Sequence, residues 1–146
     1  MIVRGQTVLP VARSVLWAVL RDPALLATAL PDADEISIED DRRFSAIASP
    51  TTGLGRTRVE MSFQIVEQRP DEFVRIRGTG TAGENLVDLS VALELTDSGD
   101  RTGAAWQADV HLRGVIGSLL RRGLGSIVNE QIEGVLAAAA SIASAV

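Results

Sequence analysis

The sequence contains no cysteine, no tyrosine and no lysine, and it has a single histidine. Without cysteine the chain can form neither disulfide bonds nor thiolate metal sites, a composition that fits a cytoplasmic protein. A zinc site would then depend on carboxylates, and the acidic residues do not cluster on one face at the spacing of ligands. We therefore predict no metal site and no cofactor.

Long apolar runs and basic stretches are also missing. The most apolar segment, residues 135–146, is alanine-rich and interrupted by serines, and it is shorter than a membrane-spanning helix requires. No charged and then apolar leader opens the chain. The net charge is −5, with acids and arginines interspersed, so there is no basic stripe to bind phosphate backbones or anionic lipid head groups. We predict no transmembrane segment and no nucleic-acid partner.

Apolar residues, in contrast, are abundant. They make up 46% of the 146 residues, whereas charged residues make up 23%. A chain of this length can bury one substantial core but not two. We predict a single domain over residues 1–146.

Apolar residues alternate with polar ones over nearly eighty residues in the middle of the chain, which is typical of strands with one buried face. Short, turn-like breaks separate the alternating stretches and indicate antiparallel hairpins. Residues 1–9 alternate more weakly and form a further strand. The residues predicted to face inward from the six central strands are Ile36 and Ile38; Phe44, Ala46 and Ala48; Val59, Met61, Phe63 and Ile65; Val74 and Ile76; Val87, Leu89, Val91, Leu93 and Leu95; and Trp106, Ala108, Val110 and Leu112.

Three segments have helical features. Residues 11–20 form a short apolar periodic run, and Asp22-Pro23 provides an N-cap and a first-turn proline for a second short helix over 23–29. Residues 115–146 are predicted to form one long helix. Its predicted apolar face comprises Ile116, Leu120, Leu124, Ile127, Val128, Val135, Ala138 and Ile142, and its predicted polar face comprises Arg122, Ser126, Asn129, Glu130 and Glu133.

These elements have few ways to bury their apolar faces. A strongly curved antiparallel sheet of about seven strands can wrap around the long C-terminal helix, with the two short helices closing one end. We therefore predict an α+β protein with the helix-grip fold.

Several stretches of the sequence match, in order and spacing, a family with this architecture. They are Val15-Leu16-Trp17, Asp22-Pro23, Leu30-Pro31, Gly78-Thr79-Gly80, Trp106-Gln107-Ala108-Asp109-Val110 and Gly114. The chain resembles, over essentially its whole length, the family of the carbon monoxide dehydrogenase G subunit, within the START-related (SRPBCC) ligand-binding superfamily. It departs from the family pattern at Asp32, where many members have glycine, and it stops at Val146, where some members continue into a hydrophobic anchor.

The resemblance implies an apolar cavity between the sheet and the helix. It also implies an accessory role beside molybdenum hydroxylases of the carbon monoxide dehydrogenase type, with binding of a quinone or lipid and peripheral contact with the inner face of the membrane.

Two patterns that could carry chemistry do not do so in this context. The run Gly78 to Gly83 spells G-x-G-x-x-G, but alternation resumes at Asn85, so no helix N-terminus follows to receive a pyrophosphate. We predict a glycine-rich hairpin. His111 falls on the outward face of its strand, and no serine motif of a hydrolase is present. We predict no catalytic residues.

Small residues recur on the inward faces, which leaves less side-chain volume than a wide curved sheet needs to fill its interior. Either a cavity forms there or the sheet curls more tightly. Gln131 and Thr7 are the candidate polar contacts, although Gln131 could instead point to the cavity mouth. The loop over residues 49–56 could cover that mouth. The predicted lining residues are Met61, Phe63, Ile76, Gly78, Gly80, Leu89, Val91, Trp106, Ala108, Val110, Ile127, Gln131, Gly134 and Ala138.

Three functions remain open from the sequence. The first is non-catalytic binding of a hydrophobic, lipid-like or quinone-like molecule. The second is a small enzyme of the same fold, such as a polyketide cyclase or hydratase, and the third is a docking subunit with an empty core. An enzyme needs acids, bases or hydroxyls within reach of its substrate, and the predicted interior offers few. We therefore favour the binding protein.

Overall fold

The computed structural model describes residues 1–52, 55–114 and 118–145. A long strand, β1 (Ile2–Leu9), is followed by two short helices, α1 (Arg13–Leu20) and α2 (Pro23–Thr28). The central strands are β2 (Ala33–Ile38), β3 (Arg43–Ala48), β6 (Val59–Arg69), β7 (Phe73–Ala82), β8 (Asn85–Ser98) and β9 (Arg101–Arg113). The last element is the helix α3 (Ser118–Ser144). The predicted order of elements is confirmed.

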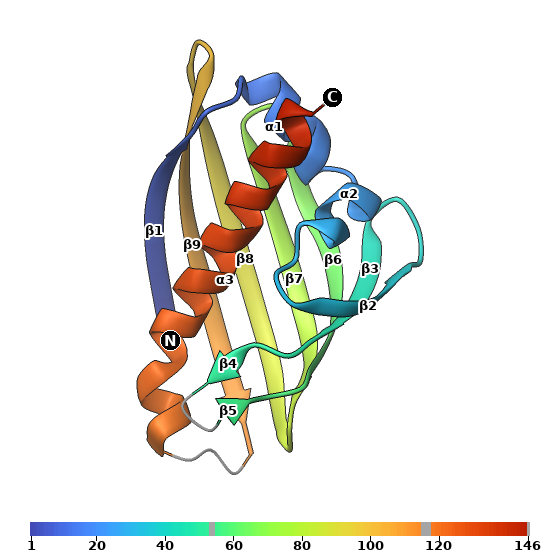
Figure 1. The fold of residues 1–146 in the computed structure, drawn as a ribbon, viewed down its shortest axis with the longest axis vertical. Helices are drawn as coiled ribbons and strands as arrows, with labels where there is room; N and C mark the ends of the chain where they lie inside the picture. The colour runs from blue at the N-terminus through green and yellow to red at the C-terminus, as the bar shows by residue number, and fades with distance from the viewer. Residues whose placement is uncertain (53–54, 115–117, 146) are drawn as a thin grey trace.

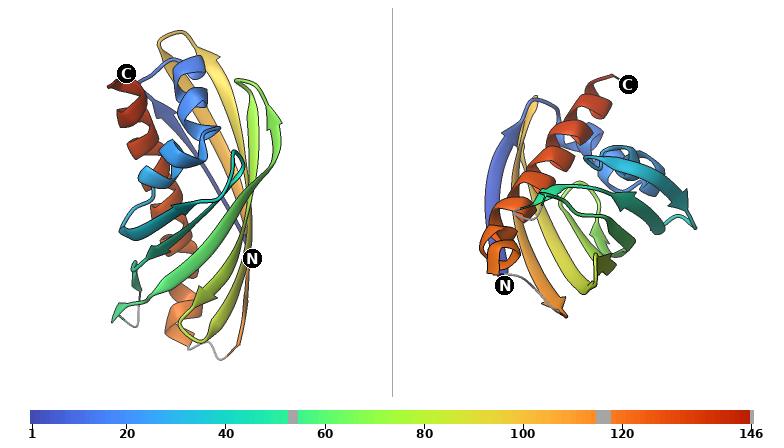
Figure 2. Two further views of the ribbon diagram at one scale, coloured as in Figure 1. Left: turned by 90° about the vertical axis from the view of Figure 1, so that its right-hand side faces the viewer. Right: turned by 60° about the horizontal axis from the view of Figure 1, so that its bottom comes forward.

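Seven strands form one antiparallel sheet in the order β1-β9-β8-β7-β6-β3-β2. The sheet is curved, and α3 runs diagonally across its concave face (Figures 1 and 2). Helices α1 and α2 lie at one end of this face, beside the C-terminal half of α3. This arrangement is the predicted helix-grip fold.

The strand faces agree with the predicted alternation. In β8, Leu93 and Leu95 are buried on the concave side, whereas Leu86 on the other face is 58% exposed. Strand β8 pairs without a break with both of its neighbours, β7 and β9, so the alternation keeps the same register across all three strands.

Two residues that were predicted to face inward are exposed. Ile36 and Ile38 pair with Ala46 and Phe44 and therefore share their face, but they are 42% and 46% exposed. The reason is that β2 is an edge strand of the sheet and has a neighbouring strand on one side only.

The loop predicted over residues 49–56 contains a small additional element. Strands β4 (Thr51–Thr52) and β5 (Gly55–Arg56) pair with each other and lie at the end of the molecule opposite α1 (Figure 1). Strand β4 contacts α3. The loop therefore approaches the N-terminal half of the long helix.

Local geometry around the short helices follows the sequence. The Asp22 carboxylate accepts a hydrogen bond from the backbone N–H of Ala24 at 2.9 Å, so Asp22 caps α2 as predicted. Asp32, the position at which related sequences were expected to carry glycine, has a φ of 58°. This left-handed conformation favours glycine, because a Cβ atom there crowds the backbone carbonyl.

The glycine-rich run from Gly78 to Gly83 is a strand followed by a hairpin turn. Strand β7 continues to Ala82, Gly83 takes a positive φ of 61°, and β8 begins at Asn85. A two-residue connection of this kind requires a positive φ, which explains the glycine. The predicted hairpin is confirmed.

The apolar face of α3 differs from the prediction in its C-terminal half. Helix α1 contacts α3 and lies beside this part of it (Figure 1). The predicted residues Val135, Ala138 and Ile142 are half-buried and pack against the core. The fully buried residues of this half are Leu136, Ala139, Ala140 and Ala143, so the apolar face is wider than predicted.

Part of the predicted α3 pattern falls on residues that the structure does not describe. Ile116 lies outside the described residues, and the side chains of Leu120 and Arg122 are not described either.

Candidate ligand-binding cavity

A cavity of about 280 Å³ lies between the concave face of the sheet and α3. Its walls come from β3, β6, β7, β8 and β9, from both short helices and from α3. The lining residues are Leu20, Leu26, Leu30, Pro31, Phe44, Ala46, Ala48, Pro50, Thr57, Val59, Met61, Phe63, Val74, Ile76, Ala82, Val87, Leu89, Val91, Leu93, Trp106, Val110, Leu112, Leu124, Ile127, Val128, Gln131, Ile132, Val135 and Leu136.

The two ends of the cavity differ in exposure. Near α1 and α2 the wall includes the buried side chains of Leu20, Leu26 and Leu136. Near β4 and β5 the wall residues Val59, Val87 and Leu112 are only half-buried. The cavity therefore has a closed end at α1 and α2 and a more open end at β4 and β5.

The wall is almost entirely apolar. Among the described residues that line it, only Thr57, Gln131 and the indole N–H of Trp106 offer polar side-chain atoms, and none carries a charge. A wall of this kind suits an apolar occupant, with orientation supplied by a small number of polar groups.

Nine of the fourteen residues predicted to line the cavity lie on its wall. Strand alternation accounts for most of them, because residues two apart on neighbouring strands share one face. The nine residues come from five elements that the fold brings together: Met61, Phe63, Ile76, Leu89, Val91, Trp106, Val110, Ile127 and Gln131.

The other five residues lie off the wall, and in three cases a neighbour fills the space beside a glycine. A Cβ atom on Gly78 would meet the ring of Phe63 at 3.0 Å, and one on Gly80 would overlap the backbone of Glu60. A Cβ on Gly134 would lie 2.8 Å from Cγ of Pro31. These three glycines accommodate close packing and leave no open volume.

The remaining two are alanines of the core. Ala108 is fully buried in it, and Ala138 packs against it from α3. Thr7, the other candidate polar contact, is half-buried on β1 and does not line the cavity.

The closed end of the cavity is lined by residues that were not among the predicted lining residues. This end is built from Leu20, Leu26, Leu30 and Pro31. These residues could have been predicted to line the cavity, because they belong to the two short helices and the segment after them. Those helices were expected to close one end of the sheet.

Trp106 connects the sheet to the long helix. Its indole Nε1–H donates a hydrogen bond to Glu133 Oε1 on α3 at 3.3 Å, and the ring covers Gly5 on β1. Glu133 was predicted to lie on the polar face of α3, away from the sheet. That prediction was wrong, because the indole is long enough to reach the flank of the helix.

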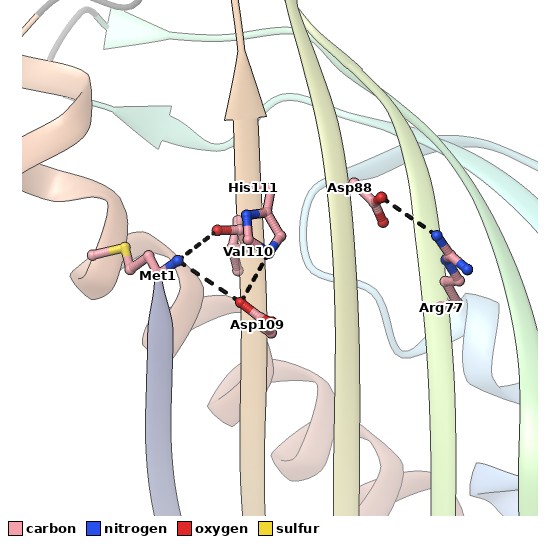
Figure 3. Close-up of polar contacts among 6 residues, drawn as sticks. All are labelled: Met1, Arg77, Asp88, Asp109, Val110 and His111. Carbon is pink, nitrogen blue, oxygen red and sulfur yellow. Dashed lines mark hydrogen bonds and ion pairs between the residues drawn. The ribbon is translucent and has the colours of Figure 1, made fainter.

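His111 lies on the outer face of the sheet, as predicted. Its Nε2 is 3.2 Å from Asp109 Oδ1, and the N-terminal amine lies 3.8 Å from the same oxygen (Figure 3). Arg77 and Asp88 form a separate ion pair nearby at 3.4 Å. Within the described residues no three His, Cys, Asp or Glu side chains are grouped so that they could hold a metal ion.

The sequence matches the profile of one protein family over nearly its whole length. The profile of carbon monoxide dehydrogenase G subunits (CoxG) matches residues 5–144. The chain belongs to the CoxG family. No curated protein sequence is significantly similar to this CoxG family member. Over residues 1–52, 55–114 and 118–145, no helix is both long and apolar enough to cross a membrane.

Solved structures share the fold of this CoxG family member. A conserved protein from Geobacillus kaustophilus is 14% identical with a TM-score of 0.86, and the match covers 99% of this chain and 95% of that one. The Zhui aromatase/cyclase from Streptomyces sp. R1128 is 17% identical with a TM-score of 0.71, covering 99% and 93%. A START superfamily protein from Mycobacterium smegmatis is 9% identical with a TM-score of 0.67, covering 98% and 97%. The chain therefore has the START-related helix-grip fold.

Proposed function

We propose that this protein binds a hydrophobic small molecule, lipid-like or quinone-like, in the cavity between the sheet and α3. In this proposal it acts without catalysis, as an accessory protein beside a molybdenum hydroxylase of the carbon monoxide dehydrogenase type. The observation that carries the proposal is the apolar wall, on which Thr57, Gln131 and the Trp106 N–H are the only polar groups among the described lining residues. The family supports the accessory role.

Burial of apolar surface would supply the affinity. A ligand that buries about 300 Å² of apolar surface gains about 7 kcal/mol from exclusion of water. Association opposes this gain through lost translational and rotational freedom. Small ligands are therefore expected to bind with micromolar to millimolar dissociation constants, and ligands with longer apolar chains more tightly.

The same wall argues against catalysis. General acid–base chemistry needs a titratable group within hydrogen-bond distance of the reacting atoms. None of the described lining residues is an acid, a base or a histidine, and His111 and Asp109 lie on the outer face of the sheet. A ligand held here would meet mainly aliphatic and aromatic carbon.

The test is uptake of apolar molecules, measured by native mass spectrometry of the purified protein mixed with quinones and fatty alcohols. The fluorescence of Trp106, which lines the cavity, is recorded in parallel in a Trp17→Phe background. The protein as purified is measured first, because a ligand can remain bound through purification.

A filled variant provides the comparison. Leu89→Phe combined with Val91→Phe places two rings on the cavity wall, and Ser90→Phe places one ring on the opposite face of the same strand. We expect the double variant to keep the circular dichroism spectrum of the folded protein and to lose uptake, and Ser90→Phe to retain uptake. A wild type that takes up none of these molecules, or a folded double variant that takes up as much as wild type, would contradict the proposal and favour a docking subunit with an empty core.

A further inference from the structure

Gln131 is the polar group that the long helix presents to the cavity. It lies on α3 among the wall residues Ile127, Val128 and Val135, and it is half-buried. Within the described part of the chain its side-chain amide makes no hydrogen bond. An amide can donate and accept at once, so it can bind either a carbonyl or a hydroxyl group.

We propose that the molecule bound in the cavity is electrically neutral and carries a carbonyl or hydroxyl group that binds the Gln131 amide, with apolar segments on both sides of that group. This inference rests on the proposed function and specifies the chemical class of the ligand. It excludes fatty acid anions and other ligands whose charge would lie inside the cavity.

The neutrality follows from the charges around the wall. None of the described lining residues is cationic, so a carboxylate inside the cavity would lose its water without gaining an ion-pair partner. The carboxylate of Glu133 accepts a hydrogen bond from Trp106, a residue of the wall. A carboxylate at this position repels an anionic ligand.

The position of Gln131 along α3 indicates where the carbonyl or hydroxyl group lies along the ligand. At about 1.5 Å per residue, Gln131 lies roughly 7 Å along the helix from Leu136, at the closed end, and roughly 10 Å from Leu124, toward the open end. Leu136 and Leu20, which line the closed end, are fully buried, so the space beyond Gln131 accepts only apolar groups. A ligand that fills the cavity therefore has its polar group between two apolar segments.

Because of the Gln131 amide, we expect the cavity to bind a ketone or an alcohol more tightly than an alkane. When an alkane fills the cavity, the Gln131 amide loses contact with water and gains nothing in return, whereas a ketone or alcohol replaces the lost hydrogen bond. We expect about a tenfold difference in dissociation constant between an internal ketone and the alkane of the same carbon number, from one hydrogen bond.

The experiment compares three probes of equal carbon number: a dialkyl ketone with an internal carbonyl, the alkane, and the fatty acid anion at neutral pH. Dissociation constants are measured by Trp106 fluorescence in the Trp17→Phe background and checked by native mass spectrometry. Three forms are compared: the Gln131→Leu variant, which replaces the amide with an apolar group; the control Glu130→Leu, which changes an exposed residue of the same helix; and wild type.

We expect wild type and Glu130→Leu to bind the ketone about tenfold more tightly than the alkane and to bind the anion more weakly than either. In Gln131→Leu the preference for the ketone should disappear while binding of the alkane remains. An anion that binds wild type as tightly as the ketone does, or a Gln131→Leu variant that keeps the preference, would overturn the inference and leave the proposed function standing. Failure of wild type to bind any probe would instead overturn the proposed function itself.

Discussion

Gly5 and Trp106 lie opposite each other in the β1–β9 pair, and their contact leaves no room for a larger residue at position 5. A Cβ atom built on Gly5 would overlap the indole ring, lying no more than 2.8 Å from three of its atoms. The ring is buried, and its Nε1–H is held by Glu133 on α3. Gly5→Ala therefore has to displace a rigid, packed side chain and the hydrogen bond that joins the sheet to the helix.

The size of the effect follows from the cost of overpacking a core. Adding a methyl group to a filled site costs about 1 to 3 kcal/mol of stability. For a chain of this size, this lowers the melting temperature by roughly 3 to 10 °C. Because Trp106 also lines the cavity, the displaced ring should change its own fluorescence and reduce uptake of ligand.

Gly103→Ala is the matched control. Gly103 lies on β9, the strand of Trp106, and a Cβ atom there would meet its nearest neighbour, Cβ of Thr96, at an ordinary 3.5 Å. Thermal melts followed by circular dichroism should show a clear loss for Gly5→Ala and little change for Gly103→Ala. Equal melting temperatures for the two variants would refute the reasoning that the indole ring requires glycine at position 5.

Three further predictions concern other parts of the chain. Asp32 has a positive φ, so Asp32→Gly should relieve strain of about 1 kcal/mol and raise the melting temperature slightly, whereas Asp32→Val should lower it. The contact of His111 with Asp109 is exposed, so His111→Ala should change stability by less than about 1 kcal/mol and leave ligand uptake intact; a substrate turnover that vanished in this variant would contradict the non-catalytic proposal. Leu93→Asp should cost about 3 to 5 kcal/mol because it buries a charge, whereas Ala92→Asp on the outer face should melt near wild type, and equal melts would contradict the assigned strand faces.

The sheet could be predicted from the sequence because its pattern is local. In a strand, alternate residues share one face, so the apolar positions indicate which face is buried. Strands β6 to β9 are long enough for this alternation to be clear. The nine predicted residues that lie on the cavity wall come from such strands or from the well-patterned middle of α3. Whether each of them contacts a ligand is a separate prediction that the proposed uptake experiment addresses.

The C-terminal half of α3 could not be predicted in the same way. Residues 137–140 are four consecutive alanines, which give the helix no preferred face. The choice among them depends on α1, a helix that is distant in the sequence and packs against α3 in the fold. Long-range packing of this kind leaves no local periodic signal.

The space beside the glycines also could not be predicted from the sequence. Gly78 and Gly134 were predicted to leave open space, because a missing side chain looks like missing volume when the sequence is considered alone. In the fold, the ring of Phe63 and the ring of Pro31 occupy those positions. A glycine in a sequence thus predicts a close approach as readily as a cavity, and only the neighbouring chain decides between them.

The sheet and the segment after α2 each contact α3 at a defined point beside the cavity. Trp106 of β9 binds Glu133 of α3, and the segment after α2 meets α3 where Pro31 packs on Gly134. The side chains between these contacts leave about 280 Å³ unfilled. An empty apolar volume of that size would lower stability by up to about 7 kcal/mol relative to a filled core, at about 24 cal/mol per Å³. In the proposed function, a ligand that occupies the space would restore the missing contacts and bind only the folded state, so the unfilled volume that weakens the free protein would also supply the affinity.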